Sequence, residues 1–214
     1  MSQKVQRFLI EAYPAIQHIF TPVIPKIRPR RIHLGDAVVR VVIGQMLSAQ
    51  AAGTIYARVA SCARQGRLNT WELGESELRG CGLSRAKSRA ITEFGAALRR
   101  DPNLVNNWRR MSAGRVTKEI SAFWGMSNWT ASILALFYLG HEDVFPRDDG
   151  SLKRALSLLE KSSGIRPKLL EPERACPYRS YLALYLWRAL DSGTLIGDKK
   201  AALPPPRKIS ADDA

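Results

Sequence analysis

The stretch KEISAFWGMSNWTASILALFYLGHEDVFPRDDGSLKR, residues 118–154, contains the features that decide the fold. Its apolar residues follow a helical period as far as Phe123, and Gly125 then breaks that period, as a residue free to adopt positive φ does. A nearly all-apolar run from Trp129 to Leu139 follows and is long enough to be a buried helix. We therefore predict two helices joined by a tight turn. The backbone N–H groups that begin the second helix favour an anion such as phosphate.

Two adjacent aspartates, Asp148 and Asp149, precede a further helix that we expect over residues 151–159. An aspartate before a helix is most often its N-cap, and the helix dipole there also favours an ionised carboxylate. Such a carboxylate can stabilise a cation-like sugar and orient or deprotonate water. The spacing leaves open which aspartate has which role.

The rest of the chain shows helical apolar periods and no strand pattern, so the predicted fold class is all-α. Helices are predicted over residues 2–20 with a kink at Pro14, 37–47 with Asp36 as N-cap, 53–64, 85–100 and 179–190. The proline-rich connector 21–31 is expected to be extended, and residues 194–214 are predicted to be a flexible, basic, proline-rich tail.

Composition indicates a partner that carries negative charge. The net charge is +14 and the pI is about 10.2, which favours DNA, RNA or an acidic membrane surface. Three widely spaced cysteines without a CxxC pair argue for a reducing compartment and against a zinc finger, and the histidines show no metal-ligand spacing. With no membrane-spanning run or signal-peptide pattern, we expect a soluble, intracellular protein.

The segment QMLSAQ, residues 45–50, places amides and a hydroxyl at the end of an apolar helix. Buried amides need hydrogen-bond partners, so this segment either closes a network in the core or faces a groove. The residues alone favour the network.

Several motifs together resemble one family. The hairpin GMSNWTA at 125–131, followed by DVFP at 143–146 and by Asp149, is similar to the helix-hairpin-helix DNA glycosylase superfamily, and within it to the 3-methyladenine DNA glycosylase II branch. The segments LRGCGLSRAKSRAI at 78–91 and PYRSYLALYLW at 177–187 extend the resemblance.

The resemblance covers, with gaps, about residues 36–190 and implies a two-lobed all-α fold with the active site in the cleft between the lobes. Residues 36–145 would form the hairpin-bearing lobe, and residues 1–35 with 146–193 the second lobe. Lys87 and Arg89 would be exposed on the scaffold.

The resemblance also assigns the chemistry. Asp149 is the implied catalytic carboxylate, which leaves Asp148 as the N-cap. Trp129 stands where bifunctional relatives carry a catalytic lysine, and an indole cannot form a Schiff base. An aromatic ring instead offers a stacking face to a cationic purine. The resemblance implies three base-pocket residues: Trp129, Gln45 and Tyr178. Against this, Trp129 on residue type alone is equally a core residue of the hairpin.

The resemblance implies that two turns contact DNA. In the hairpin, Gly125, Ser127 and Thr130 are implied to bind the backbone, with Ser127 standing where the family usually has a second glycine. In the other turn, Gln50 is the first candidate and Leu47 the second for a wedge that fills the space left by an extruded nucleotide. The family's tryptophan before Pro177 is replaced by Ala175 or Cys176, which would open one wall of the pocket.

The expected protein is a monomeric, monofunctional DNA glycosylase of base excision repair, acting on an alkylated purine in double-stranded DNA, in the cytoplasm of a bacterium or the nucleus of a eukaryote. No cofactor is expected, and no iron–sulfur cluster, because only Cys176 lies beyond Asp149. Two alternatives stay open: a glycosylase for an oxidised, deaminated or bulky modified base, and a catalytically silent DNA-binding relative.

Overall fold

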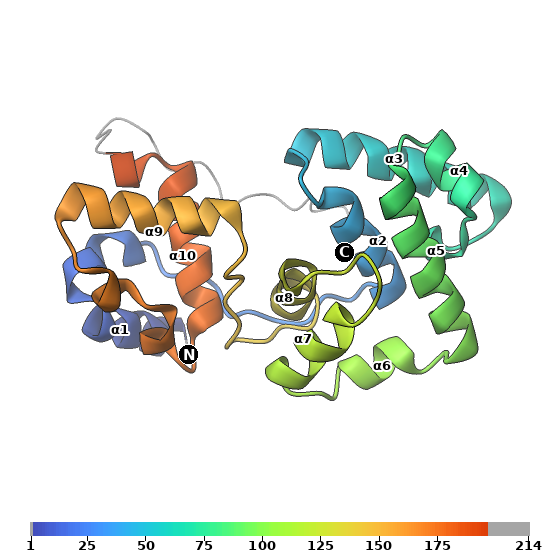
Figure 1. The fold of residues 1–214 in the computed structure, drawn as a ribbon. Coiled ribbons are helices and arrows are strands. Elements are labelled where there is room, and N and C mark those ends of the chain that lie inside the picture. The colour runs from blue at the N-terminus through green and yellow to red at the C-terminus, as the bar shows by residue number, and fades with distance from the viewer. Residues whose placement is uncertain (1, 197–214) are drawn as a thin grey trace. The chain divides into compact units, whose positions relative to one another are not determined.

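The computed structural model describes residues 2–196, and every regular element in that range is a helix. The described residues divide into two compact units (Figure 1). Residues 30–139 form what we call the hairpin unit, and residues up to Pro29 together with those from Gly140 onward form the terminal unit. The boundaries fall a few residues before those predicted from the sequence. Most of the predicted flexible tail lies outside the described residues.

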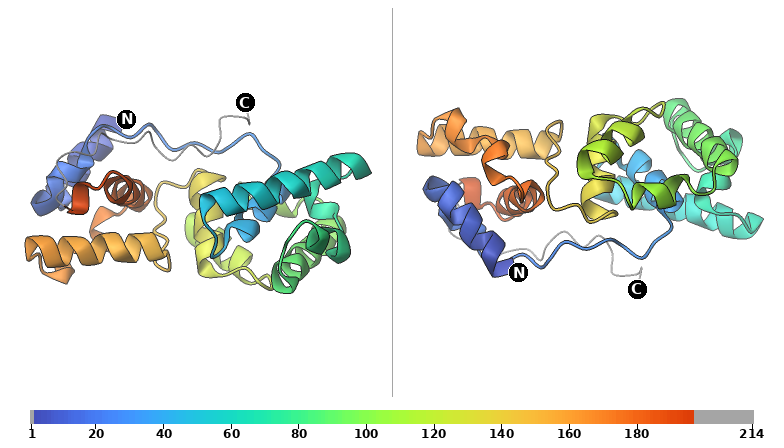
Figure 2. Two further views of the ribbon diagram at one scale, coloured as in Figure 1. Left: turned by 90° about the horizontal axis from the view of Figure 1, so that it is seen from above. Right: turned by 90° about the horizontal axis from the view of Figure 1, so that it is seen from below.

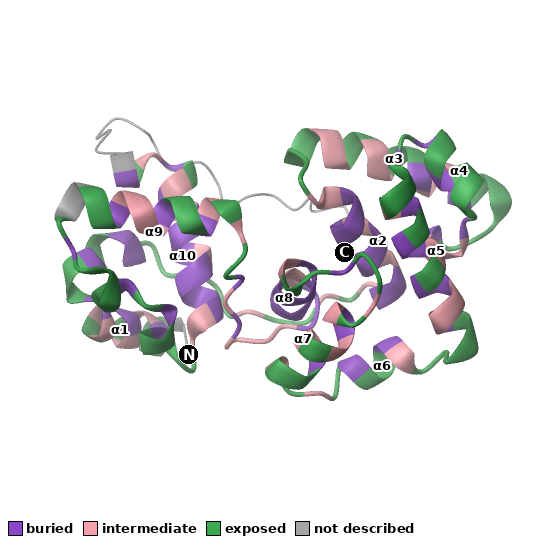
Figure 3. Cartoon of the chain, in the orientation of Figure 1, coloured by how far each residue is buried: buried purple, intermediate pink, exposed green. Residues whose placement is uncertain are grey.

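The hairpin unit contains seven α-helices and one short 3₁₀ helix. They are α2 (Leu34–Gly44), α3 (Ala49–Gly66), a 3₁₀ helix (Thr70–Glu72), α4 (Glu75–Gly80), α5 (Arg85–Arg100), α6 (Leu104–Trp108), α7 (Ala113–Ser121) and α8 (Asn128–Phe137). Helices α2 and α8 are buried along most of their length because apolar residues surround them (Figure 3). The rings of Phe94, Trp108 and Phe123 join α5, α6 and the end of α7 at centroid distances of 5.8–6.0 Å.

The terminal unit combines the beginning of the chain with its end. Its elements are α1 (Ser2–Ala12), 3₁₀ helices at Pro14–Phe20, Pro167–Leu170, Pro172–Ala175 and Thr194–Ile196, and the α-helices α9 (Gly150–Ser163) and α10 (Arg179–Asp191). Helices α9 and α10 pack side by side (Figure 2). The chain leaves α-helical geometry near Pro14, as the predicted kink requires.

The beginning of α2 differs from the prediction. Its N-cap is His33, whose Nδ1 accepts the N–H of Gly35 at 3.2 Å. The predicted cap, Asp36, lies inside the first turn and instead accepts hydrogen bonds from the N–H and Oγ1 of Thr70, at 3.2 and 2.5 Å. Asp36 therefore attaches α2 to the neighbouring 3₁₀ helix. The prediction was wrong because a side-chain acceptor three residues earlier, on His33, satisfies the helix terminus first.

No helix within residues 2–196 is long and apolar enough to cross a membrane.

Candidate active site and DNA-binding hairpin

The hairpin between α7 and α8 requires glycine at position 125 for two reasons. Gly125 has a φ of +74°, which confirms the predicted positive φ. A Cβ built on it would also lie 2.6 Å from the Cβ of Ala90 in α5. Backbone conformation and close packing therefore both exclude a side chain here.

Ser127 does not need the conformational freedom of the glycine that the family usually has at this position. Its backbone is extended, with φ −80° and ψ 172°, and it is the N-cap of α8. Its Oγ accepts the backbone N–H of Thr130 at 3.4 Å. The serine thus preserves the turn while its hydroxyl faces one of the N–H groups that an incoming phosphate would use.

The turn between α2 and α3 contains a residue that the sequence analysis missed. Met46 is fully exposed, at 101%, and has a φ of +56°, whereas Leu47 is 40% exposed. Gln50 is exposed in the first turn of α3, so its interpretation as a buried network amide is wrong. An apolar residue between two helices was the only signal in the sequence that pointed to Met46.

Gln45 does join a network, although Gln50 does not. Its Nε2 donates to the carbonyl of Gly125 at 3.0 Å and to Oγ1 of Thr130 at 2.8 Å. Gln45 is partly buried, and Thr130 is completely buried. The amide therefore connects the end of α2 to the hairpin.

Lys87 is partly buried rather than exposed as predicted. Its Nζ donates to the carbonyls of Ile43 and Gln45, at 2.8 and 2.6 Å, and burial lowers the pKa of its ammonium group. Arg89 is exposed, as predicted, and its guanidinium lies over the ring of Trp124 at 4.2 Å. The predicted exposure of Lys87 was wrong because the sequence does not show that this side chain reaches the carbonyls that a helix leaves without partners at the end of α2.

Asp149 caps α9 and contacts α10. Its Oδ1 accepts the N–H of Leu152 and the indole Nε1–H of Trp187, both at 2.9 Å. Asp148 is exposed and pairs with Lys153 at 3.5 Å, so the predicted assignment of the cap to Asp148 is wrong. The cap and the implied catalytic carboxylate are the same residue. Trp187 was missed, although it ends the motif at 177–187.

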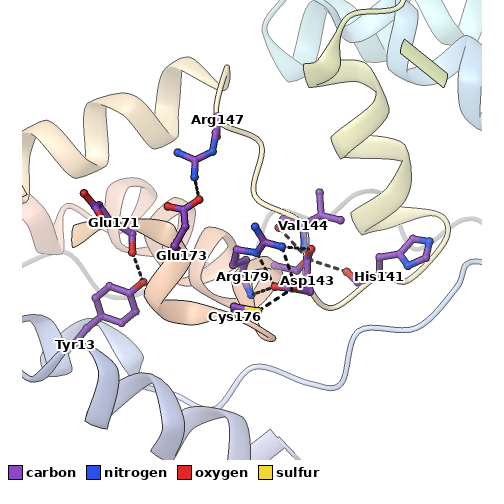
Figure 4. Close-up of polar contacts among 10 residues, drawn as sticks. Tyr13, His141, Asp143, Val144, Arg147, Glu171, Glu173, Cys176 and Arg179 are labelled. Atoms are coloured by element: carbon purple, nitrogen blue, oxygen red, sulfur yellow. Dashed lines mark hydrogen bonds and ion pairs between the residues drawn. The ribbon is translucent and has the colours of Figure 1, made fainter. Parts of the chain in front are cut away.

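The segment that leads to Asp149 is fastened to the beginning of α10 (Figure 4). Arg179 donates from Nε and Nη2 to the two carboxylate oxygens of Asp143, at 2.7 and 2.9 Å, and this pairing lowers the pKa of Asp143. The hydroxyl of buried Ser180 accepts from the N–H of Val144 at 2.9 Å and donates to the carbonyl of His141 at 2.7 Å. These bonds restrict the position of the segment that ends at Asp149.

The two aromatic residues implied in the base pocket belong to different units. Trp129 lies in the first turn of α8 in the hairpin unit and is partly exposed. Tyr178 is the N-cap of α10 in the terminal unit, also partly exposed, with its ring edge-on to Phe8 at 5.2 Å and to Tyr181 at 6.3 Å. Within residues 2–196, no group of three or more His, Cys, Asp or Glu side chains is placed to hold a metal ion.

Comparison of the whole chain with known proteins finds relatives of one kind. No protein-family model matches the sequence. The chain is 27% identical over 163 residues to DNA-3-methyladenine glycosylase 1 of Schizosaccharomyces pombe, covering 72% of this chain and 71% of the relative. It is 29% identical over 178 residues to the probable bifunctional transcriptional activator/DNA repair enzyme AlkA of Mycobacterium tuberculosis, covering 76% of this chain and 35% of the relative.

Solved structures agree on the fold. The S. pombe 3-methyladenine DNA glycosylase in complex with abasic DNA superposes with a TM-score of 0.73 at 24% identity, over 88% of this chain and 97% of that one. A DNA-3-methyladenine glycosidase from Bacillus halodurans gives 0.69 at 23% identity, over 87% and 90%. The relatives and the solved structures together support the helix-hairpin-helix DNA glycosylase superfamily for this chain. Within it, the similarity is to proteins named as 3-methyladenine DNA glycosylases and as AlkA.

Proposed function

We propose that this protein is a monofunctional DNA glycosylase that removes an alkylated purine from double-stranded DNA in base excision repair. The observation that carries the proposal is the carboxylate of Asp149, which is held at a helix N-terminus by two hydrogen-bond donors in a chain related to 3-methyladenine glycosylases.

Asp149 would stabilise the sugar as the bond between C1′ and the base breaks. That step places positive charge on the sugar ring, and a fixed carboxylate stabilises it without having to reorganise. The same carboxylate can then accept a proton from the water that attacks C1′. The products are the free base and an abasic site in an intact strand.

Base selection would draw on aromatic side chains. The rings of Trp129 and Tyr178, both partly exposed, can stack on an extruded base, and a purine made cationic by alkylation stacks favourably on an electron-rich ring. Gln45 remains a candidate for contact with the base through its side-chain oxygen, since its Nε2 is engaged by Gly125 and Thr130.

The duplex would be held by the hairpin and by the turn between α2 and α3. Gly125, Ser127 and Thr130 shape a helix N-terminus that suits a backbone phosphate, and the net charge of +14 adds a general attraction. Met46, Leu47 and Gln50 are exposed in the turn between α2 and α3 and the first turn of α3, so each side chain is available to act as a wedge.

Strand cleavage would be absent. Trp129 occupies the position of the lysine that forms a Schiff base in bifunctional relatives, and an indole nitrogen is not nucleophilic. Borohydride should therefore trap no covalent adduct between the protein and DNA. A trapped adduct at the yield of a bifunctional glycosylase would contradict this part of the proposal.

The proposal as a whole can be tested with duplex oligonucleotides that each carry one modified base. Strands with an alkylated purine should become cleavable by alkali after incubation, because alkali cuts at abasic sites, whereas untreated strands stay intact. Cleavage confined to oxidised or deaminated bases would assign a different substrate. Binding without any cleavage would identify a catalytically silent relative.

A further inference from the structure

We propose that Lys87 is a positioning residue that locks the turn between α2 and α3 in the conformation that presents Met46. The inference rests on the proposed function only in assigning Met46 to the DNA. The lock itself is a claim about the protein alone.

Residues 44–47 form a type II β-turn. Gln45 has φ −54° and ψ 125°, Met46 has φ +56°, and the N–H of Leu47 donates to the carbonyl of Gly44 at 3.2 Å. The third position of such a turn normally holds glycine or asparagine, because a positive φ is unfavourable for other residues. The fully exposed Met46 side chain gains no packing that would offset this strain.

The carbonyl of Gln45 is the part of the turn that has to be held. It belongs to the central peptide, and flipping that peptide converts a type II turn into a type I turn, in which the third residue has negative φ. Lys87 Nζ donates to this carbonyl at 2.6 Å and to the carbonyl of Ile43 at 2.8 Å. A flip would break the first of these bonds. Lys87 therefore opposes the rearrangement that would release the strain at Met46.

The same turn is connected to the hairpin. Gln45 Nε2 donates to the carbonyl of Gly125 and to Oγ1 of Thr130. Gln45 therefore contacts Lys87 through its backbone carbonyl and the hairpin through its side-chain amide. The ammonium group also lies at the C-terminus of α2, where the helix dipole favours a cation. Together these bonds fix Met46 relative to the hairpin before DNA arrives.

A wedge that is already fixed does not have to be ordered during binding, which lowers the cost of extruding a base from a duplex. A single strand requires no wedge. Loss of Lys87 should therefore slow excision from duplex and leave excision from single strands nearly unchanged. A purely structural lysine would affect both substrates equally.

The first measurement is the backbone conformation at residue 46, obtained by NMR from the free protein. Met46 should have positive φ in the wild type and move to negative φ in Lys87→Met. Lys118→Met, which removes an exposed lysine of α7, should leave φ positive. A positive φ retained in Lys87→Met would overturn the lock, whatever the protein does to DNA.

Stability provides a reading that does not require Lys87→Met to fold. Met46→Gly should raise the melting temperature in the presence of Lys87, because glycine adopts positive φ without strain. A lowered melting temperature in Met46→Gly would show that Met46 is not strained and would remove the reason for a lock.

The second measurement is excision of an alkylated purine from duplex and from single-stranded DNA. Lys87→Met should slow the duplex reaction by about ten-fold and the single-strand reaction by less than about two-fold, because only the duplex pays the cost of unstacking. In the Met46→Gly background, Lys87→Met should add less than about two-fold on duplex, as expected for two residues that act through one turn. Equal losses on both substrates, or fully additive losses, would overturn the positioning role. A wild type that releases no base would instead refute the proposed function, and the NMR result would still decide the lock.

Discussion

The indole Nε1–H of Trp187 donates to Oδ1 of Asp149 at 2.9 Å, the same oxygen that accepts the N–H of Leu152. One carboxylate oxygen is thus held from two directions, by its own helix α9 and by the neighbouring helix α10 (Figure 1). Trp187 is only 8% exposed, so little water competes for this bond. A carboxylate held in this way has a defined orientation, as a group that faces a developing positive charge requires.

Asp149→Asn should abolish excision and leave the fold nearly intact. Asparagine caps helices as well as aspartate does, and its side-chain oxygen can still accept from Leu152 and Trp187, so the free energy of unfolding should change by less than about 1 kcal/mol. Only the negative charge is lost, and the rate should fall by a factor of about 10² to 10⁴. Excision assays and urea unfolding curves provide the two readings.

Asp148→Asn is the matched control for this substitution. Asp148 is exposed and its pairing with Lys153 is a surface contact, so both stability and excision should stay close to wild type. An inactive Asp148→Asn protein beside an active Asp149→Asn protein would reverse our assignment of the catalytic residue.

Trp187→Phe should slow excision without weakening the binding of duplex DNA. Phenylalanine keeps an aromatic ring in the site but cannot donate to Asp149. A hydrogen bond to a charged group contributes roughly 1.5–3 kcal/mol, so we expect a rate loss of about ten-fold or more. Rates measured at saturating enzyme test this directly. A rate equal to that of the wild type would show that the indole N–H does not contribute to the reaction.

Asp143→Asn should reduce stability at neutral pH and have little effect in acid. Arg179 holds the pKa of Asp143 below its usual value of 3.8, so the ionised carboxylate is stabilised in the folded protein. This stabilisation is fully present above the unfolded-state pKa and is lost as the pH falls through the lower, folded-state pKa. The difference in melting temperature between wild type and variant should therefore shrink below about pH 4. A difference that is constant from neutral to acidic pH would contradict the ion pair.

The helices of this protein were largely predictable because their apolar periods are long and unbroken. Gly125 was recognised because it interrupts such a period, and its positive φ is confirmed. The errors lie at helix ends, where the outcome depends on which of several polar side chains reaches the backbone first. The N-cap of α2 is His33 rather than Asp36, and that of α9 is Asp149 rather than Asp148. In both cases the three-dimensional path of the chain determines which side chain reaches the helix terminus.

The contacts of the site were less accessible from the sequence. The bond from Trp187 to Asp149 joins residues 38 positions apart, and Lys87 reaches carbonyls more than 40 positions earlier. Neither pairing leaves a periodic pattern. Met46 was missed because its exposure follows from a turn type that sequence rules reserve for glycine or asparagine.

Gln50→Ala should slow excision from duplex DNA more than from single-stranded DNA. Extruding a base from a duplex costs a few kcal/mol, and an exposed side chain that fills the vacated space offsets part of that cost. Because Gln50 is exposed, its truncation should leave the melting temperature unchanged. Equal losses on both substrates would remove Gln50 from the wedge and leave Met46 and Leu47 as candidates.

Duplex affinity should fall steeply as salt is added. A net charge of +14 implies several phosphate contacts, and each contact releases counterions, so the logarithm of the binding constant should decrease linearly with the logarithm of salt concentration. Fluorescence anisotropy on an undamaged duplex gives the slope. An affinity that does not change between low and physiological ionic strength would argue against DNA as the partner.

The most direct test of the central claim is to identify by mass the bases that the protein releases from DNA treated with a methylating agent. We predict that the wild type releases methylated purines as free bases, and that Asp149→Asn releases none above the level of spontaneous loss. Equal release by the wild type and Asp149→Asn, or no release by the wild type from DNA that it binds, would contradict the account.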